Sequence, residues 1–191
     1  MPEKREGKIY NTCFIFGKEG ELLAKYSKTH LFDIDIKGKV SFKESDSIAK
    51  GEKIVTFDTE FGRFGIGICY DIRFPELSKL MVDEGAEMIF MPGAFNTTTG
   101  PAHWDLTLRA RAVDNQVYFA VISLARDMNF SYHAYGHSGV SDPWGTIIGQ
   151  CDENEGVVVC DIDGEKQNQI RQQLPLLQHR RKDLYTLEQR S

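Results

Sequence analysis

Cysteine is scarce in this chain of 191 residues, and the four cysteines present form no paired motif. Cys13, Cys69, Cys151 and Cys160 include no CxxC pair and no cysteine–histidine spacing of the kind that binds zinc. Few and unpaired cysteines are typical of proteins that work in a reducing compartment. The sequence therefore argues against a disulfide scaffold and a zinc module. It predicts a metal-free protein of the cytoplasm, with the mitochondrion as the alternative location.

Long hydrophobic runs and a strong charge of one sign are also missing. No apolar stretch approaches the roughly 20 residues that a membrane-spanning helix needs, and no secretory signal opens the chain. The net charge of −5 at pH 7 argues against nucleic acid or an anionic membrane as the main partner. With 41% hydrophobic residues, the chain has the composition of a soluble globular protein. We expect a single domain, 1–191, with 174–191 as a C-terminal extension.

The stretch 62–76 is the most informative, because its character changes at Cys69. Residues 62–68 (GRFGIGI) are apolar and spaced by glycine, which predicts a strand buried on both faces. Pro75 and the helical spacing of the apolar residues after it predict that a helix begins there. Cys69 is therefore expected at a strand-to-helix bend, where unpaired N–H groups favour the thiolate. The alternative is a buried cysteine that acts only as apolar filler, and geometry alone leaves both open.

Alternating strand and helix patterns along the chain predict an α/β protein with helices packed on a sheet. The segment 34–50 has no sustained hydrophobic period and is predicted to be a long loop, a kind of segment that often carries function. Strands are predicted over 9–16, 22–26, 54–58, 62–68, 88–91, 117–124 and 156–162, with short strands on both sides of the turn 141–145, and helices over 75–84, 103–115 and 164–173.

Several segments resemble a known family when they are taken together. Residues 67–76 (GICYDIRFPE) closely resemble the nucleophile signature of the nitrilase, or carbon–nitrogen hydrolase, superfamily. Residues 26–33 (YSKTHLFD) are similar to its catalytic-lysine segment, and residues 42–44 (FKE) to the loop with its substrate-side glutamate. The ordered co-occurrence of these motifs favours Cys69 as a nucleophile over the filler. Further segments that match in family order are 10–12, 91–96, 109–116, 136–138 and 142–145.

The resemblance is most similar to the omega-amidase branch, because of residues 96–104 (NTTTGPAHW) and the short insert 34–39. Enzymes of that branch hydrolyse the terminal amide of small dicarboxylic monoamides such as 2-oxoglutaramate and succinamate. The family fold is α/β (α+β), a four-layer α-β-β-α sandwich. The resemblance also implies a homodimer or higher homo-oligomer and no cofactor.

The resemblance assigns catalytic roles to four residues. Cys69 would attack the amide carbon and form a thioester while ammonia leaves, and Lys28 and the backbone N–H of Tyr70 would stabilise the oxyanion. Glu44 would orient Lys28 or the substrate amide. Without the motifs, Lys28 would be interpreted as a solvated lysine at a strand end and Glu44 as a surface carboxylate.

Substrate binding is assigned by the same resemblance to Phe95, Asn96 and Thr97 and to two arginines. Arg73 and Arg126 could each bind a carboxylate, since a guanidinium matches that group with two parallel hydrogen bonds. The alternative for both is a structural ion pair, with Asp71 or Asp127 respectively. The histidines of the matched motifs are expected to be structural hydrogen-bonding residues; they are His30, His103 and His137.

The general base of the family is a glutamate for which this sequence offers no counterpart. It belongs to a segment before the strand 9–16, and Glu3 and Glu6 lie too close to that strand to be this residue. We therefore expect the first strands and helices of the family domain to be absent from this sequence. Three functions stay open: omega-amidase-like hydrolysis, a catalytically silent module that associates with a homologue or partner, or the same chemistry on deaminated glutathione, N-carbamoyl compounds or nitriles.

Overall fold

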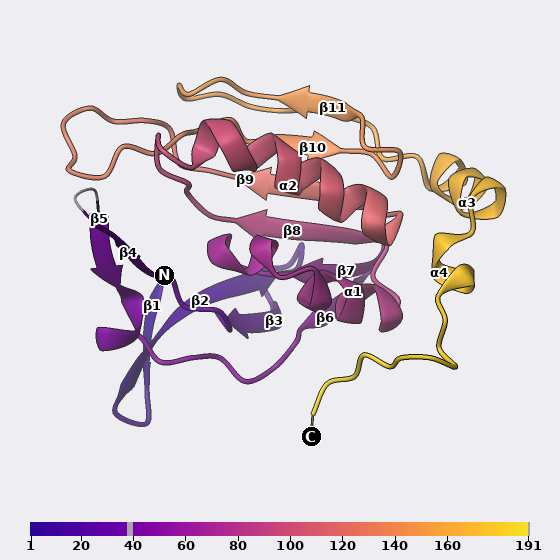
Figure 1. Cartoon of the computed structure of the whole chain (residues 1–191), viewed down its shortest axis with the longest axis horizontal. Helices are drawn as coiled ribbons and strands as arrows, with labels where there is room; N and C mark the ends of the chain where they lie inside the picture. The colour runs from indigo at the N-terminus through magenta and orange to yellow at the C-terminus, as the bar shows by residue number, and fades with distance from the viewer. Residues whose placement is uncertain (38–39, 191) are drawn as a thin grey trace.

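A computed structural model describes residues 1–37 and 40–190. Gly38 and Lys39, which end the insert 34–39, lie outside the described residues, as does Ser191. The predicted α/β class is confirmed, with strands and helices alternating along the chain (Figure 1). The elements are β1 (Pro2–Arg5), β2 (Lys8–Phe16), β3 (Leu22–Ser27), β4 (Asp33–Ile36), β5 (Val40–Lys43), η1 (Glu44–Asp46), β6 (Thr56–Thr59), β7 (Gly62–Ile66), η2 (Cys69–Arg73), α1 (Pro75–Asp83), β8 (Met88–Pro92), α2 (Gly100–Asn115), β9 (Tyr118–Ile122), β10 (Gly139–Ser141), β11 (Ile147–Gln150), α3 (Gly164–Gln173) and α4 (Leu176–His179).

A six-stranded sheet in the order β11-β10-β9-β8-β7-β6 forms the centre of the molecule. The neighbours β7, β8 and β9 run parallel, while the other pairs are antiparallel. Parallel neighbours require crossover connections, and α1 and α2 supply the two crossovers that join β7 to β8 and β8 to β9. Both helices lie across the same face of the sheet (Figure 1).

The main core lies between these two helices and the sheet. Alternate residues of β8, Ile89 and Met91, pack there with Met81 of α1 and with Trp104 and Leu108 of α2. All five are at most 1% exposed. Since successive strand residues point to opposite faces, the intervening residues of β8 face the other side of the sheet.

On that other side lies a smaller sheet of β1, β2 and β3. Tyr26 of β3 is fully buried against Ile66 and Ile68, next to the strand end that leads to Cys69. Within the described residues the layers are therefore helices, the six-stranded sheet and the three-stranded sheet. This arrangement brings the strand that precedes Lys28 close to the end of β7.

Two predictions of local structure are wrong. The segment 34–50, predicted to be a long loop, contains the β4–β5 hairpin, in which Asp33 pairs with Lys43 and Ile34 with Phe42. The segment 156–162, predicted to be a strand from its β-branched residues, lies beside β11 but forms no strand. Val159 within this segment is 90% exposed, so the β-branched residues of the segment do not indicate a buried strand.

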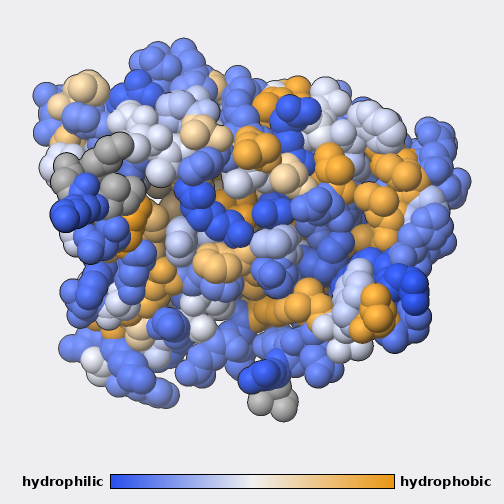
Figure 2. Space-filling view, in the orientation of Figure 1, coloured by the Kyte–Doolittle hydropathy of each residue, from blue (hydrophilic) through white to orange (hydrophobic). Residues whose placement is uncertain are grey.

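The surface on the side of α1 and α2 is mostly hydrophilic, and hydrophobic side chains gather there in separate patches (Figure 2). Among the described helices, none combines the length and the apolar character that crossing a bilayer requires.

Candidate active site

Cys69 lies at the predicted bend between a strand and a helix. Strand β7 ends at Ile66, the 3-10 helix η2 begins at Cys69, and α1 begins at Pro75. Cys69 has a φ of +51°, a left-handed conformation that costs free energy for a residue with a side chain. A Cβ on Gly93 would lie 2.6 Å from the Cβ of Cys69, so only glycine permits this close approach. The backbone therefore holds the thiol in a constrained position.

Lys28 and Glu44 form a buried ion pair. The Nζ of Lys28 donates to Oε2 of Glu44 over 2.6 Å, and the side chains are 4% and 11% exposed. The same carboxylate oxygen accepts a hydrogen bond of 2.7 Å from the backbone N–H of Phe32. These positions contradict the interpretations of Lys28 as a solvated lysine and of Glu44 as a surface carboxylate.

One cavity of about 170 Å³ brings together most of the predicted site residues. Cys69 and Lys28 line it together, so the two side chains on which the predicted chemistry depends lie in one pocket. The residues that line the cavity are Lys28, Phe32, Phe42, Glu44, Cys69, Tyr70, Arg73, Ala94, Phe95, Asn96, Thr99 and Tyr132.

Thr97 does not line this cavity, although Asn96 and Thr99 do. It lines an adjoining cavity of about 420 Å³ that shares Phe32, Phe42 and Tyr132 with the first. The Oδ1 of Asn96 accepts hydrogen bonds from the backbone N–H groups of residues 98 and 99, which shapes the turn around Thr97. Thr97 therefore lines the adjoining cavity of about 420 Å³ and not the cavity at Cys69.

Arg73 lines the cavity, and within the described residues its guanidinium forms no ion pair. The predicted alternative, an ion pair with Asp71, is not formed. Its Nη1 lies 3.2 Å from Nδ1 of His103, and its guanidinium carbon lies 4.6 Å above the ring of Phe95. The cation is thus held by an imidazole and an aromatic face.

Arg126, predicted to bind substrate, lines neither of these two cavities. Its Nε and Nη2 donate to the backbone carbonyls of Ala134 and Tyr135, and its Nη1 lies 3.8 Å from Glu153. The guanidinium thus holds the loop before β10. The predicted alternative was an ion pair, but its partner is Glu153 and not Asp127.

The three histidines take part in structural hydrogen bonds, as predicted. The Nδ1 atoms of His30 and His103 lie beside Asp71 and Arg73 respectively, and that of His137 lies 2.8 Å from the carbonyl oxygen of Tyr135.

Five cavity residues received no role from the sequence: Phe32, Phe42, Ala94, Thr99 and Tyr132. The hydroxyl of Tyr132 donates to the carbonyl of Ala94 over 2.7 Å, and the Sγ of Cys69 lies 3.6 Å from the same oxygen. Partial burial and the neighbouring Cys69 raise the pKa of Tyr132 to about 12, so its hydroxyl keeps its proton. In the sequence, Tyr132 is marked only by its place in a loop, 131–138, that is rich in polar and aromatic residues.

The surroundings of Cys69 act on its thiol in two opposite directions. Burial raises the pKa of Cys69, and the ammonium of Lys28 opposes this shift without overcoming it. The cost of burying a negative charge thus opposes the helix-end effect that the sequence indicates. The thiol needs a base before it can attack.

This raised pKa predicts a specific pH dependence. We expect the alkylation rate of Cys69 by iodoacetamide to reach half its maximum above pH 8.5, the ordinary cysteine value, because the thiolate is the reacting form. Mass spectrometry of the peptide that contains Cys69 over a pH series measures this rate. A midpoint below pH 8 would contradict the assignment of a protonated resting thiol.

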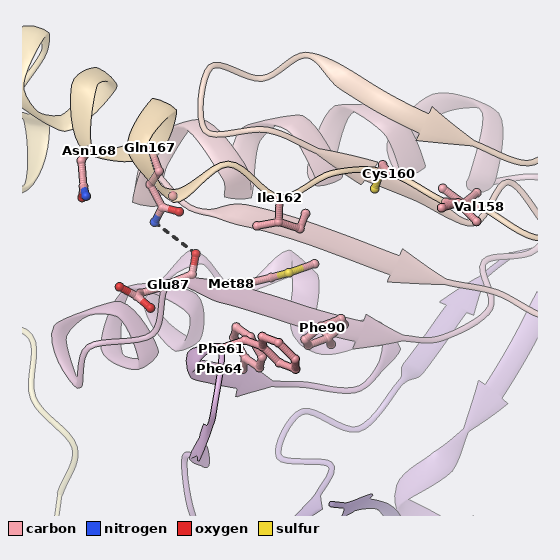
Figure 3. A pocket seen from close by; sticks show the side chains of 12 residues that line it. Phe61, Phe64, Glu87, Met88, Phe90, Val158, Cys160, Ile162, Gln167 and Asn168 are labelled. Atoms are coloured by element: carbon pink, nitrogen blue, oxygen red, sulfur yellow. Dashed lines mark hydrogen bonds between the residues drawn. The ribbon is translucent and has the colours of Figure 1, made fainter. Parts of the chain in front are cut away.

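A larger cavity of about 730 Å³ lies on the sheet face opposite α1 and α2 (Figure 3). Phe64, Met88 and Phe90 form its floor, and Ile162 lies above them. It shares no lining residue with the cavity at Cys69, and Cys160 in it has no lysine or arginine among the lining residues. The arrangement of groups needed for nucleophilic attack is therefore found at Cys69.

No set of three or more histidine, cysteine, aspartate or glutamate side chains is arranged to hold a metal in the described parts of the chain.

Comparisons with known proteins agree with the resemblance of the sequence motifs. A family model described as carbon-nitrogen hydrolase matches residues 1–172. The chain is 52% identical over 188 residues to the protein named Omega-amidase NIT2 of Homo sapiens, which covers 98% of this chain and 68% of that protein. The similar protein of Xenopus tropicalis is 50% identical over 190 residues, which covers 100% of this chain and 69% of that protein.

Two solved structures are also similar. Nit3 of Saccharomyces cerevisiae, a member of branch 10 of the nitrilase superfamily, has a TM-score of 0.87 at 47% identity, over 95% of this chain and 64% of that chain. The NitFhit protein of C. elegans has a TM-score of 0.88 at 42% identity, over 94% of this chain and 44% of that chain. The chain thus spans about two thirds of the curated relatives and less than two thirds of these solved chains.

Proposed function

Because the chain belongs to the carbon–nitrogen hydrolase family, we propose that its site cleaves the terminal amide of small dicarboxylic monoamides. The predicted resemblance to the nitrilase superfamily is confirmed by the family match and by the similar structures. The observation that carries the proposal is one cavity holding a cysteine, a buried lysine and an arginine without an acidic partner among the described residues. The names of the omega-amidase relatives support the same substrate class.

The proposed reaction begins with attack of the Cys69 sulfur on the amide carbon. The sulfur–carbon bond forms while the carbonyl oxygen takes the negative charge of a tetrahedral intermediate. Collapse of that intermediate breaks the carbon–nitrogen bond, and the nitrogen leaves as ammonia after it gains a proton. Water then hydrolyses the thioester and releases the dicarboxylic acid.

The oxyanion of this intermediate needs fixed positive groups close to the sulfur. The ammonium of Lys28 lies in the cavity with Cys69, and η2 begins at Cys69, so the backbone N–H of Tyr70 belongs to the first turn of a helix. N–H groups in a first turn lack intrahelical partners and point toward negative charge. Glu44 holds Lys28 through the ion pair, which keeps the ammonium in place before substrate arrives.

The proton of the thiol must go to a base. Within the described residues, the carboxylates whose charge acts on Cys69 are those of Glu44 and Asp71. Glu44 already accepts from Lys28 and Phe32, and Glu3 of β1 accepts from Lys25 and Thr12. The family resemblance gives this role to a further glutamate for which the sequence offers no counterpart, so ammonia release by the chain itself tests whether the reaction proceeds without it.

Ammonia release tests the proposal directly. The purified chain is expected to release more ammonia from succinamate than from butanamide, which is similar in length but lacks the carboxylate. Equal release from both amides would contradict the substrate class. Absence of release from succinamate, together with binding of the chain to a full-length homologue, would favour the catalytically silent module instead.

Arg73 should set this preference for a carboxylate. We expect Arg73→Met to raise KM for succinamate about tenfold or more, because an ionic hydrogen bond contributes about 1.5–3 kcal/mol, while kcat changes less. Steady-state ammonia release measures both constants. Arg109→Met is the matched control, because the Nε of Arg109 donates to the carbonyl of Gly145, outside the cavity. An unchanged KM in the Arg73 variant would show that the carboxylate binds elsewhere.

A further inference from the structure

The carboxylate of Asp71 is fully buried and surrounded by hydrogen-bond donors. Its Oδ1 accepts from Oγ1 of Thr29 at 3.1 Å and from the backbone N–H of His30 at 3.0 Å, and Nδ1 of His30 lies 2.8 Å away. Its Oδ2 accepts from the hydroxyl of Tyr26 at 2.7 Å and from the backbone N–H of Ile68 at 2.8 Å. Each oxygen thus has at least two partners.

These partners come from two separate parts of the chain. Tyr26, Thr29 and His30 lie on both sides of Lys28 in sequence, whereas Ile68 immediately precedes Cys69. Burial and the negative charge of Asp71 raise the pKa of Tyr26, so the hydroxyl keeps its hydrogen and donates it to the carboxylate. One side chain therefore connects the segment of the lysine to the turn of the cysteine.

The backbone of Lys28 has separate support. Its N–H donates to the carbonyl of Asn11 at 2.8 Å, and its carbonyl accepts from the N–H of Gly51, also at 2.8 Å. These bonds fix Lys28 next to β2, but neither reaches the six-stranded sheet or the turn at Cys69. The position of Lys28 relative to Cys69 therefore depends on other contacts between the two layers. The hydrogen bonds of Asp71 are such contacts.

We propose that Asp71 is a positioning residue that sets the distance between the Nζ of Lys28 and the Sγ of Cys69. Asp71 does not line the cavity, so it acts through the two residues that do. The inference rests on the proposed function only for the identity of that pair. Its test needs no hydrolysis, so failure of one proposal is distinguishable from failure of the other.

The test measures how strongly Lys28 acts on the thiol, with and without Asp71. The rate at which iodoacetamide alkylates Cys69 at pH 8 is measured by mass spectrometry in the full chain and in its Lys28→Met variant. Loss of the nearby ammonium is expected to slow alkylation about tenfold, which corresponds to a rise of one unit in the pKa of Cys69. The same pair is then measured in an Asp71→Asn background.

We expect the effect of Lys28→Met to fall below about twofold in the Asp71→Asn background, because the lysine is no longer held beside the thiol. Comparing the two rates within one background cancels the direct effect of the lost Asp71 charge on the thiol. A full tenfold effect in that background would overturn the proposal, since the lysine would then keep its place without Asp71.

Asp142→Asn is the matched control. Asp142 is 1% exposed and accepts from the backbone N–H groups of Trp144 and Thr146 and from Nζ of Lys166, in the turn between β10 and β11. It is a buried carboxylate of similar connectivity outside the cavity. The tenfold effect of Lys28→Met should persist in this background, and its loss there would mean that any damaged carboxylate network gives the same result.

Two milder variants apply if Asp71→Asn does not fold, which circular dichroism would reveal. Tyr26→Phe and Thr29→Val each remove one hydrogen bond to Asp71 and keep the size of the side chain. Combined, they are expected to reduce the effect of Lys28→Met to about threefold or less. A full tenfold effect in the folded double variant would overturn the proposal.

Discussion

Replacing Cys69 by alanine is expected to lower kcat/KM for succinamate by at least about 10⁴-fold, because the variant has no atom that can form the thioester. Removing the nucleophile from a set of groups that act together leaves only the residual effect of binding and oxyanion stabilisation. Ammonia release in steady state measures the loss, and mass spectrometry of the native chain after rapid quenching should detect an acyl adduct on Cys69.

Cys151→Ala is the control for this experiment, because Cys151 lies outside the cavity. Its variant is expected to keep native activity. Substantial ammonia release from the Cys69→Ala variant would show that the amide is cleaved without this thiol and would remove the basis of the proposed mechanism.

Replacing Lys28 by methionine is expected to lower kcat by about 10²- to 10³-fold, the loss typical of one missing oxyanion donor. The substitution also leaves the carboxylate of Glu44 buried without its cation, which is expected to destabilise the fold by about 3–5 kcal/mol. Loss of activity and loss of stability therefore have to be separated. Denaturant unfolding monitored by circular dichroism measures the second effect.

The double variant Lys28→Met with Glu44→Gln separates them. Neutralising the carboxylate should recover most of the lost stability, whereas kcat should stay low because the ammonium is still missing. Lys25→Met is the matched control: Lys25 lies on β3, the strand that precedes Lys28, and pairs with Glu3 over 2.7 Å, but it is 34% exposed and outside the cavity. Recovery of kcat in the double variant would assign Lys28 a purely structural role.

The pattern of the sequence was sufficient where structure is decided locally. The strand before Cys69 and the helix that begins at Pro75 were both predicted from adjacent residues, although β7 ends at Ile66 and Arg63 within it is exposed. The meeting of Lys28, Glu44 and Cys69 is different. These residues come from separate elements, and only the family resemblance placed them together before the structure did.

The errors have a common physical origin in contacts between distant segments. The β4–β5 hairpin depends on pairing between two strands of only four residues each, which is too short for a clear period. Burial raises the pKa of Cys69, and some of the side chains that share its cavity, such as Tyr132, are remote in sequence. Arg126 had the right chemistry for a carboxylate, but its donors are used by backbone carbonyls of its own loop.

The stacking of the two sheets has a consequence for how such a site can change over generations. Cys69 follows a strand of the six-stranded sheet, whereas Lys28 follows a strand of the three-stranded sheet. Neither sheet alone therefore carries both residues of the site. A recombinant that takes its two sheets from diverged genes must therefore keep the packing of Tyr26 on Ile66 and Ile68. Without that packing it would contain both Lys28 and Cys69, but the two side chains would not share one cavity.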